Sequence, residues 1–174
     1  GRSSVAEHEF GIARKQVGST GQPAQAIRVE LLRCAVQVAA LAYDGCGEFT
    51  TLQVDASPAD LAYARYLAGN ASAADAGLLP EPQRQVAAST DDRAAAAAAA
   101  AIPDPLSRLV AAGALLRANR ATPELLTTAI NTASGQGWRR ALLAWMQIQL
   151  QRAEQAGDQV EAERIRRRIA LATR

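Results

Sequence analysis

The chain has 174 residues and a mass of 18.3 kDa, which suits one ordinary domain or two small helical subdomains that share a linker. Basic and acidic residues are nearly balanced, 19 against 17, and the formal net charge of +2 does not support steering of nucleic acid by overall charge, so a nucleic acid partner is not expected. No window reaches the roughly 18 consecutive apolar residues that a membrane-spanning helix requires. Because only 4% of the residues are aromatic, we expect large side chains such as Phe10, Phe49, Trp138 and Trp145 to carry much of the packing.

Arginine supplies almost all of the positive charge. Lys15 is the only lysine, so 18 of the 19 basic residues are arginine. Together with the abundant alanine, this usage is typical of a GC-rich bacterial genome. We therefore expect a bacterial protein of the cytoplasm or, if a signal peptide has been removed, of the periplasm.

Two helices are predicted at the start of the chain. Ser4 and Glu7 have the spacing of a capping box, which predicts a helix from Ser4 to about Val17. Pro23 opens a longer helix that we expect to continue to the glycines at 45 and 47. Its apolar residues recur four and three positions apart, at Ile27, Leu31, Cys34, Val38 and Leu41. The pair should form an antiparallel hairpin in which the second helix is central.

Cys34 and Cys46 are the two cysteines of the chain. On one continuous helix they would lie about 18 Å apart, which is too far for a disulfide. We therefore expect free, mostly buried thiols. The alternative is a bridge in an oxidising compartment, which requires the chain to double back at Gly45.

The next segment contains one β-like stretch and then a third helix. Residues 49–54 have the composition of a strand, but no partner strand is evident, so we expect an extended connector. Ser57, Pro58 and Asp60 then predict a helix start, and Gly69 with Asn70 predicts its end. Residues 4–69 are thus expected to form an N-terminal hairpin plus a third helix.

Residues 70–103 are expected to be a low-complexity linker rich in Ala and Pro. Eight consecutive alanines occupy positions 94–101. Residues 90–92 could cap a short helix there, but alanine side chains offer little apolar area, so we expect this helix to bury little.

Residues 104–174 carry four helix patterns with short loops. Starts are predicted at Asp104 with Pro105, at Thr122 with Pro123, at Trp138, and at Asp158, where Val160 and Ile165 are expected to face inward. Such a series predicts an antiparallel four-helix unit. The expected fold class is therefore all-α, built from antiparallel helical hairpins in a bundle or a short stack.

Residues 142–171 resemble one tetratricopeptide hairpin, meaning helix, turn and helix. The resemblance is carried by Leu143, by the small pair Ala153 and Ala156, by the turn at Gly157 and Asp158, and by Ala162 and Ile165. It covers one hairpin of roughly 30 residues and lacks the family's proline after the second helix. It implies similar supersecondary structure, and such hairpins offer grooves to other proteins.

Two groups of residues are candidates for an interaction surface. Basic residues of the last two predicted helices could contact an acidic protein, a headgroup or the phosphates of nucleic acid, but the neighbouring acidic residues favour a solvated, self-paired face. Tyr63 and Tyr66 could mark a contact surface or could pack against the linker. The candidate surface comprises Trp138, Arg139, Arg140, Tyr63, Tyr66, Arg164, Arg167 and Arg168.

The sequence favours binding over chemistry. His8 is the only histidine, no nucleophile elbow or phosphate-binding loop is present, and we expect no catalytic residue, metal or cofactor. The expected function is a non-catalytic helical module for protein-protein interaction or scaffolding. The alternative is an enzyme or small-ligand-binding domain with a site between helices. An exposed apolar groove near Trp138 and Trp145 would favour the first, and a closed pocket with perturbed carboxylates the second.

Overall fold

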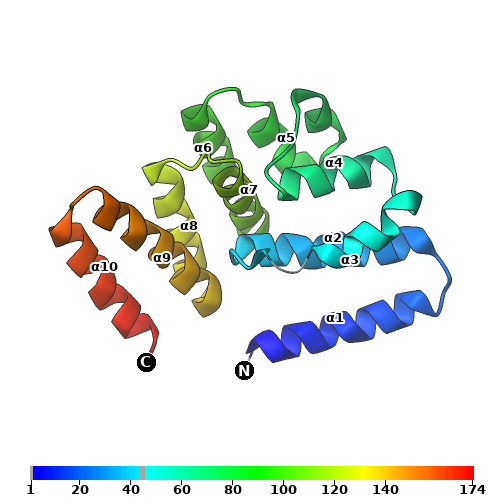
Figure 1. Cartoon of the computed structure of the whole chain (residues 1–174), viewed down its shortest axis with the longest axis horizontal. Coiled ribbons are helices and arrows are strands. Elements are labelled where there is room, and N and C mark those ends of the chain that lie inside the picture. Colours follow the sequence, from blue (N-terminus) through cyan, green and yellow to red (C-terminus); the bar gives the residue numbers. More distant parts are fainter. Residues whose placement is uncertain (1, 44–45) are drawn as a thin grey trace.

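The computed structural model describes residues 2–43 and 46–174, without the side chains of residues 2–4, 6 and 7. Every regular element in these two ranges is a helix, which confirms the all-α prediction. The helices pack side by side in a bundle-like arrangement (Figure 1). The predicted capping box of Ser4 and Glu7 lies outside the described side chains.

Helices α1 (Arg2–Gly18) and α2 (Pro23–Ala39) form the predicted antiparallel hairpin (Figure 1). Pro23 occupies the first turn of α2, where its missing N–H would have no helical partner in any case. Across the hairpin, the Arg14 guanidinium donates to both carboxylate oxygens of the buried Glu30, at 2.6 and 3.1 Å. This bidentate ion pair ties α1 to α2.

Helix α2 is shorter than predicted. Ile27, Leu31, Cys34 and Val38 are buried as expected, but the helix ends at Ala39. Leu41 follows with a φ of 56°, in the left-handed region that a continuing helix cannot contain. The predicted extension of the helix to residue 45 is therefore wrong.

The expected extended connector at residues 49–54 is also wrong. These residues lie in α3 (Gly47–Leu52) and in the short 3₁₀ helix η2 (Gln53–Asp55). Phe49 is buried, and α3 packs against α2. A strand would have needed a neighbour to pair its backbone, whereas short helices form some hydrogen bonds within the segment and still bury the phenylalanine.

Helix α4 (Pro58–Leu67) begins and ends as predicted. Ser57 and Asp60 form a reciprocal capping box, in which the Asp60 N–H donates to Ser57 Oγ and the Ser57 N–H donates to Asp60. Gly69, with a φ of 79°, turns the chain away after the helix.

Residues 70–103 bury far more than expected. They form the 3₁₀ helix η3 (Ala73–Leu78) and the helices α5 (Glu81–Ala88) and α6 (Asp92–Ala101). Leu79, Val86, Ala95 and Ala99 all belong to the core. The expectation of little burial is wrong because small side chains let α6 pack closely against α5, α7 and α8.

The C-terminal helices follow the predicted starts. They are α7 (Pro105–Arg117), α8 (Pro123–Gly135), α9 (Arg139–Gln155) and α10 (Gln159–Ala172). Side chains of Asp104, Thr122 and Asp158 cap α7, α8 and α10 by accepting backbone N–H groups. The predicted hairpin of α9 and α10 is present, with Ile165 buried, but Val160 is 82% exposed and does not face inward.

One apolar core runs through the described residues of both sequence halves. Trp145 is its largest fully buried side chain, and its indole Nε1 donates to the Ala39 carbonyl at 3.0 Å. Trp145 is thus a core anchor, as predicted, but it joins α9 to the end of α2. The N-terminal and C-terminal parts share this core, and their division at residues 70–103 stays a prediction.

Helices α7 and α2 approach each other closely where they cross at Gly113. A Cβ atom placed on Gly113 would lie 2.4 Å from the Val38 carbonyl oxygen and 2.7 Å from Val38 Cγ1. Both distances are below any ordinary contact, and the nearest atom belongs to the backbone. Only glycine allows the two helices to approach this closely.

We therefore expect Gly113→Ala to lower the free energy of unfolding by about 1 to 3 kcal/mol, because the added methyl group overpacks the crossing. Gly11→Ala is the matched control, since Gly11 lies within α1 and nothing would contact its Cβ. It should raise helix stability by up to about 1 kcal/mol. Urea denaturation followed by circular dichroism measures both, and equal stability of the two variants would contradict the close crossing.

We also expect Trp145→Ala to destabilise the protein by about 3 to 5 kcal/mol, because it leaves a large cavity and an unpaired Ala39 carbonyl. Arg167→Ala, at an exposed position of α10, should change stability by less than about 0.5 kcal/mol. Thermal and urea unfolding test both expectations. A Trp145→Ala protein that melts like wild type would show that the indole is not a core anchor.

Candidate functional site

A groove of about 940 Å³ lies between α1, the C-terminal end of α2, the start of α7 and the start of α9. Helices distant in the sequence meet there, because α2 ends beside the turn that leads into α9 (Figure 1). The described residues that line it are Phe10, Arg33, Val36, Gln37, Ala39, Ala40, Ala42, Leu106, Leu109, Gly137, Trp138, Arg139, Arg140, Ala141 and Leu143.

Most of this lining is apolar. Phe10, Val36, Leu106 and Leu143 are half-buried, each packing partly on the molecule and leaving part of its surface open. Helix α1, which carries Phe10, packs against α2. Half-exposed large apolar side chains gathered in one groove are typical of a binding surface.

Trp138 is held at the edge of the groove by the turn before α9. Gly137 takes a φ of 64°, and the Trp138 N–H donates to the Ala133 carbonyl at 3.0 Å. Trp138 is the N-cap residue of α9, and its side chain accepts no capping hydrogen bond. The half-buried indole therefore lies beside the groove, fixed by the backbone around it.

The charged part of the lining is positive. Arg139 and Arg140 are exposed in the first turn of α9, which contains no acidic residue. Arg33 lies 3.9 Å from Glu30. No Asp or Glu stands among the described lining residues. Because the start of a helix carries partial positive charge, the two arginines add to a positive potential at this end of the groove.

The other predicted surface residues lie elsewhere. Tyr66 is buried, and its hydroxyl donates to Gln83 Oε1 at 2.7 Å. Tyr63 stacks on Tyr66, with ring centroids 6.4 Å apart. Burial raises the pKa of Tyr63 to about 12 and that of Tyr66 well above its ordinary value. The tyrosines thus pack against residues 70–103, which is the alternative that the sequence left open.

The arginines of α10 form mostly a self-paired face. Arg164 pairs with Glu161, and Arg166 pairs with Glu154 and Glu163. Hydrogen bonds from Arg164 lower the pKa of the Glu161 carboxyl. Arg167 is exposed and Arg168 half-buried on the same helix. None of these α10 arginines lines the groove.

Sequence reasoning found Trp138, Arg139 and Arg140 but missed the apolar part of the groove. Phe10, Val36, Leu106 and Leu143 come from four different helices. Each fits an ordinary inward-facing position of its own helix, so no local pattern marks it. Only the three-dimensional packing shows that the four side chains surround one opening.

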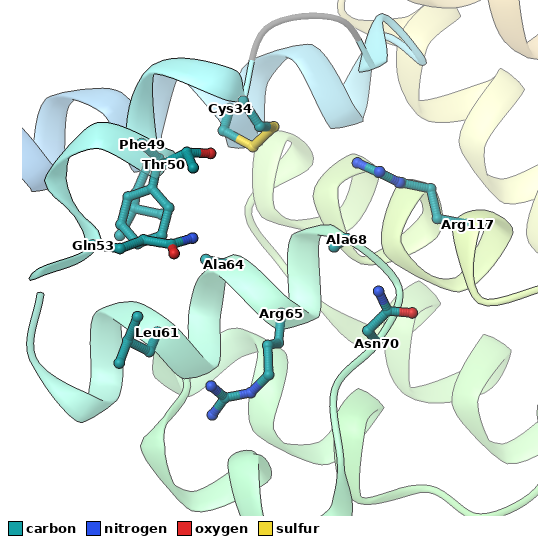
Figure 2. Close-up of a pocket in the computed structure, with 12 residues that line it drawn as sticks. Cys34, Phe49, Thr50, Gln53, Leu61, Ala64, Arg65, Ala68, Asn70 and Arg117 are labelled. Atoms are coloured by element: carbon teal, nitrogen blue, oxygen red, sulfur yellow. A yellow bond between two sulfur atoms is a disulfide. The ribbon is translucent and has the colours of Figure 1, made fainter.

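A second, smaller cavity of about 350 Å³ lies beside the two cysteines, between α2, α3, α4 and α7 (Figure 2). Its basic side chains are already engaged. Arg65 forms an ion pair with Asp75, and hydrogen bonds from Arg65 and from the Ser72 backbone hold the pKa of the Asp75 carboxyl well below its usual range. The Arg117 guanidinium lies over the Tyr43 ring, 4.7 Å from its centroid.

Cys34 and Cys46 form a disulfide at the edge of this cavity (Figure 2). The expectation of free thiols is wrong, because it assumed one continuous helix from Cys34 to Cys46. Since α2 ends at Ala39, the chain returns along the helix and brings the two Cα atoms within 4.9 Å. That separation suits a disulfide.

In the described part of the chain, no group of three or more His, Cys, Asp or Glu side chains is placed to hold a metal ion. No helix there is long and apolar enough to cross a bilayer. Comparisons with protein-family models, with curated proteins and with solved structures found no match.

The disulfide generates a prediction. Denatured protein that has not been reduced should show no free thiol towards a thiol reagent. Reduction should lower the free energy of unfolding by about 3 kcal/mol. Without the bridge the unfolded chain can adopt more conformations, which stabilises the unfolded state. Thiol titration and urea denaturation with and without reductant measure both. Two reactive thiols per unreduced chain would contradict the bridge.

Proposed function

We propose that this protein is a non-catalytic helical module that binds another protein through the groove at the start of α9. The observation that supports this proposal is the open apolar groove beside Trp138. Its apolar lining and half-buried aromatic residue match the composition of protein-binding sites, where aromatic side chains and arginine are enriched.

The fixed position of the groove adds support. Its lining includes Ala39 and Leu109, which are buried in the common core. The Ala39 carbonyl also accepts a hydrogen bond from the indole N–H of the buried Trp145. A partner would therefore meet a preformed surface and would not have to order it. Preformed surfaces bind more tightly because less conformational entropy is lost on association.

Site-directed disruption of the groove tests this function. Leu143→Glu places a charge in the apolar lining, and Leu171→Glu, at an exposed leucine of α10, is the matched control. In a pull-down from a lysate of the source organism, wild type and Leu171→Glu should capture the same protein. Leu143→Glu should not capture it. Circular dichroism confirms that all three proteins are folded. Retention by folded Leu143→Glu would contradict binding through the groove.

The second candidate is binding of a small ligand in the cavity beside the disulfide. Its volume of about 350 Å³ falls at the lower end of the range for small-molecule sites. We place it second because Arg65 and Arg117 already have partners within the protein. Native mass spectrometry would detect such a ligand, and Ala68→Trp, which fills the cavity, would remove it.

A further inference from the structure

We propose that the partner segment is an acidic amphipathic helix, with its apolar side in the groove and its carboxylates on Arg139 and Arg140. This inference rests on the proposed function and specifies the chemistry of the partner.

The lining of the groove favours a helix. Its apolar side chains come from α1, α2, α7 and α9, and they surround an opening whose walls are themselves helices. An amphipathic helix enters such a groove with residues spaced three and four apart, which form one continuous apolar stripe. An extended strand would find no sheet edge here, because the described lining residues on these four helices already have helical backbone partners.

The charge of the groove favours acidic residues. Arg139 and Arg140 are exposed, and neither forms an ion pair or a side-chain hydrogen bond with another described residue. They also stand in the first turn of α9, where positive side chains are opposed by the helix dipole. Carboxylates from a partner would relieve this repulsion and form charge-assisted hydrogen bonds with the guanidinium groups.

The directions of the two arginines favour a helical partner over a ligand with a single anionic headgroup. Neighbouring residues on a helix point about 100° apart, so the two guanidinium groups leave α9 in different directions. A fatty acid offers one carboxylate beside its apolar chain. A helix presents a row of carboxylates along the edges of its apolar stripe and can reach both arginines. Nucleic acid phosphates would meet the arginines but would leave the apolar lining without a partner.

The test uses two synthetic helical peptides of about five turns. Both carry the same Leu and Trp residues on one face, and the other positions are Glu in the acidic peptide and Lys in the basic one. Fluorescence anisotropy measures binding to the full chain. The acidic peptide should bind wild type at least about tenfold more tightly than the basic peptide, and this ratio should fall as salt is added.

Variants then locate the binding. The double variant Arg139→Glu with Arg140→Glu should bind the acidic peptide at least about tenfold more weakly than wild type does. It should bind the basic peptide more tightly than the acidic one. Arg167→Glu with Arg174→Glu makes the same change of charge at exposed positions of the C-terminal end, and it should leave the affinity within about twofold. Leu143→Glu should abolish binding of the acidic peptide.

Three results would overturn the inference. The basic peptide could bind wild type as tightly as the acidic one, or the Arg167 and Arg174 variant could lose as much affinity as the groove variant. Dodecanoate could bind with dependence on Arg139 and Arg140 while the acidic peptide does not. In each case, loss of the cellular partner by Leu143→Glu would still support the groove as a protein-binding site, so failure of the inferred chemistry is distinguishable from failure of the proposed function.

Discussion

The contact on which the rest of the structure depends is the crossing of α2 and α7 at Val38 and Gly113. The absence of a side chain at Gly113 lets the backbones of the two helices approach until the Val38 carbonyl meets the glycine. With few large side chains in the chain, the core gains its density from such close approaches and from buried alanines such as Ala95 and Ala99. Dispersion contacts between closely packed backbones thus replace part of the aromatic packing found in other small domains.

The groove arises where this crossing ends. Helix α2 stops at Ala39, directly after the crossing, and its last carbonyl accepts the Trp145 indole N–H. The same stop allows the chain to return so that Cys46 reaches Cys34. The early end of this one helix therefore permits the covalent link, and residues just after it, Ala40 and Ala42, also line the groove.

Local sequence signals predicted the helix starts. The burial of α6 and the apolar lining of the groove depend on long-range packing, which these signals do not contain. Ser57, Asp104 and Thr122 predicted their helix starts because a capping side chain satisfies backbone groups within the first turn. Pro23 predicted its helix start because proline fits the first turn, where its missing N–H would have no helical partner. The burial of the alanine helix α6 was underestimated. Its small side chains let it pack closely against neighbouring helices, although each alanine has little apolar area of its own. Of the groove, the sequence indicated the polar edge, where Trp138 and two arginines are adjacent in the chain. Its apolar side chains come from four separate helices. The apolar pattern of one helix does not show which side chains of the other three will lie beside it.

The central position of α2 also affects how the chain folds as it is made. Its apolar residues precede α7 in the chain, yet α7 is one of the helices that cover them, and the Ala39 carbonyl receives its partner from Trp145, 106 residues later. Contacts of such separation close slowly, because the intervening chain loses conformational entropy before they form. During translation Val38, which lies against Gly113, therefore stays partly exposed until α7 leaves the ribosome. In that interval the nascent chain presents the apolar surface that chaperones recognise and that promotes aggregation.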